Sequence, residues 1–201
     1  MAANMNVTAS QRRQTVSGIA ASAAVTALLW WLLWRFLPAP SGLSALQTAV
    51  QCCAVAALLT VVAGVEAVAH ERLVTPAIDP LVGFETRRLK VNFRYLSNTV
   101  EQYLVFAAGL LAVSFYASPR VLVILTTVWV LARWAFWVGY HRSSLLRGLG
   151  APGMMQSMLV LLYVAFRFGS DAYGAAAGIA LVATFLAIEA LLFWAVSRPA
   201  Q

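Results

Sequence analysis

The stretch Val91-Asn-Phe-Arg-Tyr-Leu-Ser-Asn-Thr-Val-Glu-Gln-Tyr103 decides the fold, because it carries polar and charged residues into a long apolar run that ends at Tyr116. A run of that length can cross a bilayer as a helix. Arg94, Asn98 and Glu101 are spaced i, i+4 and i+7, so they share one stripe of that helix. Ionisable groups in hydrocarbon cost roughly 3 kcal/mol each and usually face a protein interior. The stripe therefore predicts either a site for a zwitterionic, peptide-like ligand or an internal clamp between helices.

The composition of the whole chain also favours a membrane protein. Of the 201 residues 62% are hydrophobic and only 10% charged, and the mean hydropathy is +0.80. A soluble domain carries about 25% charged residues. The length suits one helical bundle without a second, soluble domain. The net charge of +7 comes from basic residues in the gaps between apolar runs, a pattern of membrane topology and not of nucleic-acid binding.

We expect an all-α, integral membrane helical bundle of about six spans. The six apolar runs are Val16 to Leu37, Leu43 to Ala69, Val91 to Tyr116, Val121 to Tyr140, Met154 to Phe168 and Tyr173 to Val196. The longest gap, Glu71 to Lys90, contains Pro76, Pro80 and Gly83, and we expect it to cap the bundle on the cytoplasmic side.

The placement of Lys and Arg predicts that both termini are cytoplasmic. One side of the membrane receives Arg12, Arg13, Arg72, Arg87, Arg88, Lys90, Arg142, Arg147 and Arg198, whereas the other receives Arg35, Arg120 and Arg167. The short tails, without a transit or retention signal, favour a bacterial inner membrane.

A second stretch, Ala132-Arg-Trp-Ala-Phe-Trp-Val-Gly-Tyr-His-Arg-Ser-Ser-Leu-Leu-Arg147, places three residues seven apart. Arg133, Tyr140 and Arg147 share a face if the helix continues past the membrane. We expect Arg133 to form an ion pair with Glu101. Tyr140 and Arg147 then lie near the cytoplasmic surface, where a charged ligand can enter from water. The alternative for Arg147 is a positive-inside anchor.

Several chemistries find no support in the sequence. The only cysteines, Cys52 and Cys53, are adjacent on a predicted helix and point apart, and no metal-ligand spacing exists, so we expect no metal. There is also no phosphate loop, zinc signature or Gly-x-Ser-x-Gly elbow. A proton-coupled carrier with Glu66, Glu101 and Glu189 along a path remains an alternative.

The two motifs together resemble the MAPEG superfamily, the membrane-associated proteins of eicosanoid and glutathione metabolism that include the microsomal glutathione transferases. The resemblance rests on Phe-Arg-x-x-x-Asn-x-x-Glu at 93–101 and Ala-Arg-x-x-Phe-x-x-Gly-Tyr-x-Arg-Ser-x-x-Leu-Arg at 132–147. It implies a four-helix core over 43–169, with one extra helix and tail at each end, in 1–42 and 170–201. It also implies a homotrimer with glutathione sites between neighbouring subunits.

The resemblance assigns a role to each matching residue. It implies that Arg147 stabilises the glutathione thiolate and that Tyr140, Arg142 and Arg72 bind the tripeptide. It also implies that Arg94, Asn98 and Glu101 bind glutathione or hold the subunit interface. The function it implies is a glutathione-dependent membrane transferase or peroxidase acting on lipophilic electrophiles, with glutathione as co-substrate. Phe136 stands where several members have a tyrosine, and Gln102 stands where some have another, so two ligand hydroxyls are missing unless Tyr103 or Tyr95 substitutes. The alternative to an enzyme is a non-catalytic protein that keeps the bundle.

Overall fold

The structure, a computed structural model of the whole chain, describes residues 2–79, 81, 83–142 and 147–196, with side chains from Val16 to Ala195. The part described is helical and contains no strand. Its elements are α1 (Ala2–Phe36), α2 (Ala45–Ala56), the π-helix η1 (Ala57–Val62), α3 (Ala63–Leu73), the 3₁₀ helix η2 (Pro76–Ile78), α4 (Arg87–Val113), α5 (Pro119–Arg142), α7 (Ala151–Tyr173) and α8 (Ala175–Val196). Six stretches are long and apolar enough to cross a membrane. The prediction of an all-α integral membrane bundle is therefore confirmed.

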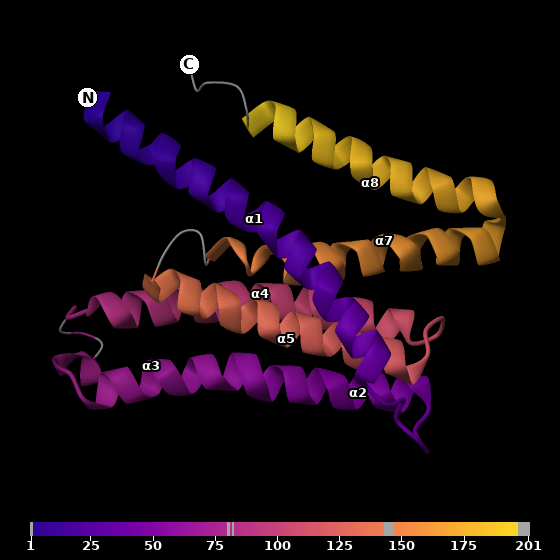
Figure 1. Ribbon diagram of the computed structural model, residues 1–201, viewed down its shortest axis with the longest axis horizontal. Helices are drawn as coiled ribbons and strands as arrows, with labels where there is room; N and C mark the ends of the chain where they lie inside the picture. Colours follow the sequence, from indigo (N-terminus) through magenta and orange to yellow (C-terminus); the bar gives the residue numbers. More distant parts are fainter. Residues whose placement is uncertain (1, 80, 82, 143–146, 197–201) are drawn as a thin grey trace. The chain divides into compact units, whose positions relative to one another are not determined.

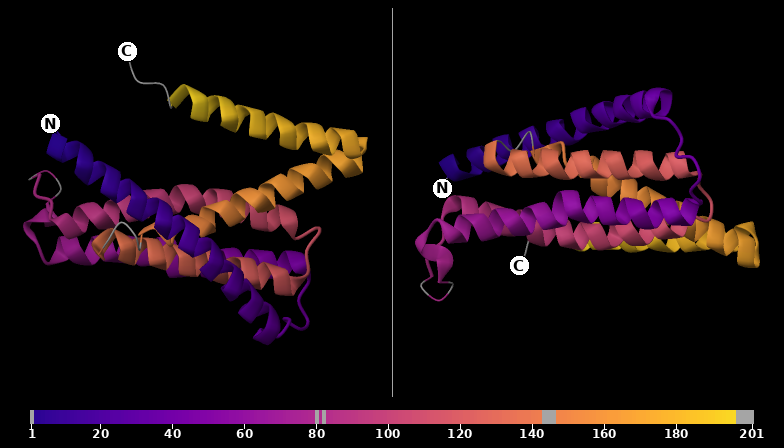
Figure 2. Two further views of the ribbon diagram at one scale, coloured as in Figure 1. Left: turned by 45° about the horizontal axis from the view of Figure 1, so that its top comes forward. Right: turned by 90° about the horizontal axis from the view of Figure 1, so that it is seen from below.

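The chain divides into two compact units, Met1–Ser157 and Met158–Gln201. In the first unit α2, η1 and α3 form one continuous rod that lies alongside α4 and α5, and α1 crosses α5 (Figures 1 and 2). Its core is built from large buried side chains, among them Tyr95 of α4 and Trp129 of α5. The rings of Trp129 and Phe106 stack with their centroids 4.5 Å apart. This packing fixes α4 and α5, the two helices that carry the sequence motifs.

Side-chain caps explain where two of these helices begin. Ser44 and Gln47 form a capping box at the start of α2, and the Thr86 hydroxyl accepts a hydrogen bond from Leu89 N at the start of α4. Such caps satisfy backbone N–H groups that have no partner within the helix. The Thr86 cap lets α4 begin at Arg87, and α3 continues to Leu73, so the connection between them is shorter than the predicted gap of Glu71 to Lys90.

The π-helix η1 interrupts the rod in the middle of a span. Two aromatic side chains from neighbouring helices bind its backbone: Tyr95 Oη donates to Thr60 O over 3.3 Å, and Trp134 Nε1 donates to Leu59 O over 3.0 Å. Gly64 follows one turn later, and a Cβ there would lie 3.1 Å from the Tyr95 ring. The rod therefore approaches α4 closely at this level, and polar side chains satisfy carbonyls that the irregular turn leaves open.

The second unit contains the later part of α7 and all of α8, which form an antiparallel hairpin (Figure 1). Gly174 joins the two helices with φ +92°, and Tyr173, predicted to begin the last span, is instead the final residue of α7. The hairpin is tight, because a Cβ at Gly169 would lie 2.8 Å from Gly178 Cα. In α8 the lone carboxylate of Glu189 is exposed.

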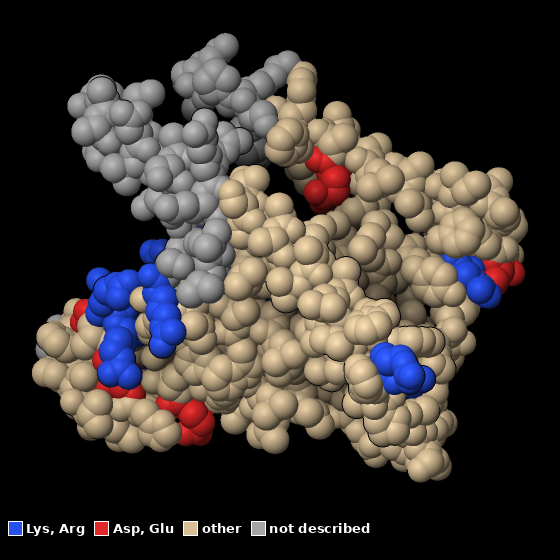
Figure 3. Space-filling view, viewed as in Figure 1, with Lys and Arg blue, Asp and Glu red and all other residues tan. Residues whose placement is uncertain are grey.

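Basic side chains gather at the end of the first unit where α3 connects to α4 (Figure 3). Arg87, Arg88 and Lys90 are all exposed there. Arg198, another of the basic residues used to predict the topology, lies outside the described residues.

Candidate functional site

Arg133 lies at the centre of the candidate site as a buried cation in the membrane-spanning part of α5. Its exposed fraction is 1%. One guanidinium nitrogen, Nη1, donates to Asn98 Oδ1 over 3.0 Å, and Nη2 donates to Gly150 O over 3.4 Å. Nε is buried without a hydrogen bond. The positive charge thus has neutral acceptors but no carboxylate partner among the described residues.

This arrangement corrects the predicted ion pair between Arg133 and Glu101. Glu101 is exposed on α4 and forms no ion pair in the part of the chain that the structure describes. Asn98 and Glu101 lie about 60° apart around the helix axis, and Asn98 is half-buried whereas Glu101 is exposed. Asn98 faces α5, where its Oδ1 accepts from both Arg133 and Gln102 Nε2.

A stack of two cations and two aromatic rings runs from Arg133 of α5 to Arg147, which follows the end of α5 at Arg142. The Arg133 guanidinium lies 4.4 Å from the ring centroid of Phe136. The Phe136 and Tyr140 rings meet edge to face, with centroids 4.8 Å apart. The Arg147 guanidinium then lies 5.6 Å from the Tyr140 ring centroid. The three residues whose spacing suggested a shared face, Arg133, Tyr140 and Arg147, thus lie in one row with Phe136, and two cations flank a pair of aromatic rings.

Backbone contact between α5 and the start of α7 holds one end of this stack. A Cβ at Gly150 would lie 2.4 Å from Phe136 Cβ, and a Cβ at Gly153 would lie 3.0 Å from Ala132 Cβ. Gly150 O is also an acceptor for Arg133. Gly150 was not predicted from the sequence, although the Gly-Leu-Gly-Ala-Pro segment at 148–152, which leads into α7, is a signal for close backbone approach.

The remaining residues of the first motif lie on a different surface. Arg94 and Glu101 belong to an exposed stripe along α4, whose members follow one another at intervals of three and four residues. The stripe consists of Arg87, Lys90, Arg94, Ser97, Glu101, Leu104, Ala108 and Leu111. The charges of Arg94 and Glu101 lie well inside a span, where exposure to lipid is costly. Among the described residues neither Arg94 nor Glu101 forms a hydrogen bond or ion pair.

The predicted substitutes for the missing tyrosine hydroxyls are occupied elsewhere. Tyr95 Oη donates to Thr60 O, and Tyr103 Oη donates to Cys53 O over 3.1 Å. Both hydroxyls therefore hold α4 to the α2–α3 rod. Phe136 contributes only its ring to the stack.

Arg72 and Arg142 stand apart from the stack. The Arg72 guanidinium lies 5.0 Å from the Phe93 ring centroid, and its Nε is buried without a hydrogen bond. Arg142 is exposed in the last turn of α5. Residues 143–146 of the second motif lie outside the described chain.

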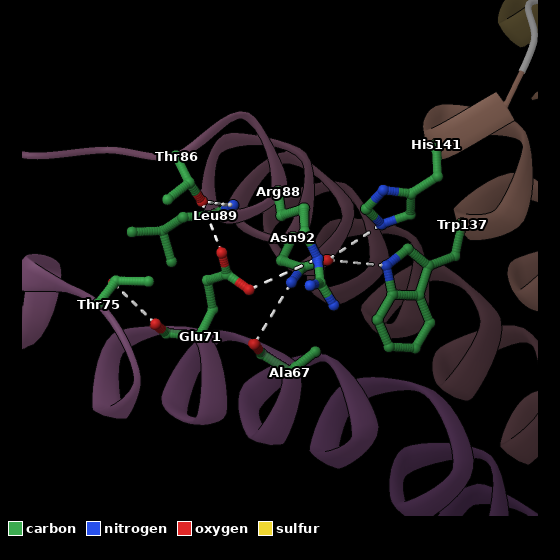
Figure 4. A network of polar contacts seen from close by, with 9 residues as sticks. All are labelled: Ala67, Glu71, Thr75, Thr86, Arg88, Leu89, Asn92, Trp137 and His141. Carbon is green, nitrogen blue, oxygen red and sulfur yellow. Dashed lines mark hydrogen bonds and ion pairs between the residues drawn. The ribbon is translucent and has the colours of Figure 1, made fainter.

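A polar network next to the stack was not predicted (Figure 4). Asn92, with an exposed fraction of 5%, donates through Nδ2 to Ala67 O over 3.3 Å. Its Oδ1 accepts from Trp137 Nε1 over 3.0 Å and contacts His141 Nε2 at 3.3 Å. One amide thus connects α3, α4 and α5. Its only sequence signal is a single polar residue near the start of an apolar run.

The same network includes a buried carboxylate, that of Glu71 (Figure 4). Thr86 Oγ1 donates to Glu71 Oε1 over 2.7 Å, and Arg88 Nε lies 3.6 Å from Glu71 Oε2. These contacts tie the end of α3 to the start of α4. The network holds the end of α5 where Tyr140 and Arg142 lie.

The geometry can accept an anion. Guanidinium groups keep their protons and bind carboxylates through paired hydrogen bonds. Arg133 is positioned but lacks a counter-ion, and Arg147 lies half-buried at the end of the stack.

Comparison with known proteins identifies one family. A sequence model of the MAPEG family matches residues 47–169, which run from α2 into α7. No curated protein and no solved structure gives a match.

Proposed function

Because the chain belongs to the MAPEG family of membrane proteins of glutathione and eicosanoid metabolism, we propose that it binds glutathione and transfers it to lipophilic electrophiles or uses it to reduce lipid peroxides. The stack from Arg133 to Arg147 carries this proposal. It offers two guanidinium groups beside an apolar surface of rings, and one of them is a buried cation that forms no ion pair with any described residue. Glutathione supplies two carboxylates and a thiol.

Arg147 is the residue that we assign to the sulfur. A thiol with a pKa of about 8.5 is mostly protonated at neutral pH, and the thiolate is the nucleophile. A guanidinium stabilises the thiolate by its charge without losing a proton. In transfer, the thiol proton leaves to water and the thiolate forms a carbon–sulfur bond with the electrophilic carbon. In a substitution, the leaving group departs as an anion with its bonding electrons; in an addition to a double bond, the π electrons move to the neighbouring atom, which takes a proton from water. In peroxide reduction, two glutathione molecules give one disulfide, one alcohol and one water.

We assign the tripeptide to six residues on different parts of the chain. They are Tyr140 in the stack, Asn98 beside it, Arg94 and Glu101 on the exposed stripe of α4, Arg142 at the end of α5 and Arg72 at the end of α3. These groups lie on separate surfaces of one chain. Arg94 and Glu101 carry charge on an exposed stripe of a spanning helix, which supports a site completed by a neighbouring subunit.

The exposed stripe of α4 also supports a homotrimer. Steps of three and four residues are the spacing that helices use when they pack against parallel partners. Charged residues on such a stripe are unfavourable against lipid and acceptable against protein. The proposal includes a four-helix core over 43–169 with extra helices in 1–42 and 170–201, both termini in the cytoplasm, and a bacterial inner membrane.

A non-catalytic membrane protein is the second candidate. The observation that favours it is the bonding of Arg133 to Asn98 and Gly150, which joins α5 to α4 and to the start of α7. In that case the buried cation holds helices together and needs no ligand.

The experiment that separates these candidates is glutathione titration of the detergent-purified protein by calorimetry, with a thiolate absorbance scan of the same sample. We expect binding together with a thiolate band, and we expect Arg147→Ala to remove the band while the oligomer persists. Binding without a thiolate would favour a retained site without chemistry. No binding at millimolar glutathione would overturn the proposal.

A further inference from the structure

A pocket of about 280 Å³ lies in the first unit, toward the end of α5 opposite to the stack. Its wall includes Pro40 and Leu43 of the α1–α2 connection, Cys52 and Val55 of α2, and Val123 and Thr127 of α5. The volume is several times the share of roughly 30 Å³ that one water molecule occupies. Its helical residues belong to membrane spans, so hydrocarbon is its natural surrounding.

Four polar side chains line this pocket, and the three threonine hydroxyls are satisfied, whereas the exposed amide of Gln51 has no hydrogen bond among the described residues. The hydroxyls of Thr48, Thr126 and Thr127 donate to carbonyls of their own helices, to Ser44 O over 2.9 Å, to Leu122 O over 2.8 Å and to Val123 O over 2.9 Å. What remains for an occupant is mainly alkyl surface, with the thiol of Cys52 and the amide of Gln51. A pocket with so few free polar groups is suited to an alkyl chain.

A cation lies one turn before the pocket on the same face of α5. Arg120, Val123 and Thr127 are spaced i, i+3 and i+7. The Arg120 guanidinium lies 5.0 Å from the Trp34 ring centroid and donates to Trp34 O, and its Nε is buried without a hydrogen bond. Arg35, in the last turn of α1, is exposed.

Neither Arg120 nor Arg35 forms an ion pair with any described residue. Arginine next to tryptophan at the end of a span is the usual setting of the membrane interface, where lipid phosphates lie. Arginine binds phosphate through charge-assisted hydrogen bonds. The pocket thus has an apolar interior and, one helical turn away, an uncompensated positive charge.

We propose that this pocket holds one acyl chain of a phospholipid whose phosphate is bound by Arg120. The bound lipid would join the α1–α2 connection to α5. The proposal is independent of the glutathione site, because it uses none of the residues assigned to glutathione.

The two adjacent cysteines provide a reporter with a matched control. Cys52 lines the pocket and Cys53, its neighbour on α2, does not. The Cys53→Ser variant retains Cys52 as the reporter of the pocket, and the Cys52→Ser variant retains Cys53 as the control. Each full-length variant is purified in detergent and treated with N-ethylmaleimide, with and without dioctanoyl phosphatidylglycerol, and the alkylation rate is read from the intact mass.

We expect saturating phosphatidylglycerol to slow alkylation of Cys52 at least fivefold and to leave the rate of Cys53 unchanged. Adding Arg120→Gln to the Cys53→Ser protein should raise the lipid concentration needed by about tenfold, a loss of roughly 1.4 kcal/mol in binding. Dioctanoylglycerol has the same acyl chains but no phosphate. With the Cys53→Ser protein it should protect Cys52 only as weakly as phosphatidylglycerol protects Cys52 in the protein that also carries Arg120→Gln.

Three results would overturn the proposal: an unchanged Cys52 rate, equal slowing of both cysteines, or equal protection by dioctanoylglycerol. If Cys52 does not react even without lipid, intact-mass measurement of the native complex decides instead. We expect one phosphatidylglycerol per chain, and its loss in Thr127→Trp, whose indole fills the pocket. Retention of that lipid by Thr127→Trp in a folded protein would overturn the proposal as well.

Discussion

Arg133 Nη1 donates to Asn98 Oδ1 over 3.0 Å, so the buried cation of α5 is bound to an amide and not to the carboxylate three residues further along α4. A neutral acceptor stabilises a guanidinium without cancelling its charge. The site is therefore left with net positive charge in a low-dielectric region, which raises its affinity for anions.

Replacing Asn98 with Leu tests the cost of removing this acceptor. Arg133 then loses a charge-assisted hydrogen bond while it remains buried, and we expect the free energy of unfolding to fall by about 2 kcal/mol. Denaturation in detergent, followed by circular dichroism, measures the difference.

Replacing Arg133 with Met separates structure from ligand binding. Removing a buried charge and filling its volume is often neutral or stabilising, so we expect unfolding to change by less than about 1 kcal/mol. Glutathione binding should nevertheless disappear in the calorimeter. A variant that unfolds readily and still binds glutathione would support a structural clamp.

Replacing Gly150 with Ala tests the close approach of α7 to α5. The new Cβ would overlap Phe136 Cβ at 2.4 Å, whereas Gly153→Ala meets only the methyl of Ala132 at 3.0 Å. We expect Gly150→Ala to lower the free energy of unfolding by about 2 kcal/mol and Gly153→Ala to lower it by less. Equal losses in the two variants would show that the closer approach at Phe136 adds no further destabilisation.

Replacing Asn92 with Leu removes the amide that connects three helices. The backbone carbonyl of Ala67 and the indole N–H of Trp137 lose their partner together. At about 1 kcal/mol per hydrogen bond, and more where a buried group is left unpaired, we expect a loss of roughly 2–3 kcal/mol in detergent unfolding. His141→Phe is the matched control: it removes one contact of Asn92, so its loss should be smaller.

Replacing Leu104 with Trp tests the α4 stripe as a subunit interface. Leu104 is 65% exposed in the single chain, and Leu58, on the π-helix, is 58% exposed. In an interface a larger side chain is not accommodated, whereas lipid adapts to it. We expect Leu104→Trp to shift the purified protein from trimer to smaller species in light scattering and Leu58→Trp to leave it unchanged. A stable trimer in both variants would remove α4 from the interface.

The sequence was sufficient for much of this fold because hydropathy and helical spacing are local properties. Six spans, the motif on α4 and the stack on α5 could all be predicted from them. The partner of Arg133 could not, because periodicity shows which residues share a helix face and not which neighbouring side chain they meet. The same limit hid Asn92, since its three contacts come from two other helices.

Helix boundaries were predicted less well for a different reason. The apolar run suggests a start near Val91, but the Thr86 cap allows α4 to begin at Arg87. Charged residues at the end of a span continue the helix when a cap is present, and hydropathy does not register the cap.

The π-helix at Ala57–Val62 has a consequence for comparing this chain with its relatives. A π turn contains one more residue than the α turn that it replaces. A homologue with a regular helix at this level should therefore align with a one-residue gap inside the span, where alignment methods penalise gaps most strongly. Without that gap, either the residues before the π turn or those after it would be matched to positions about 100° away around the helix.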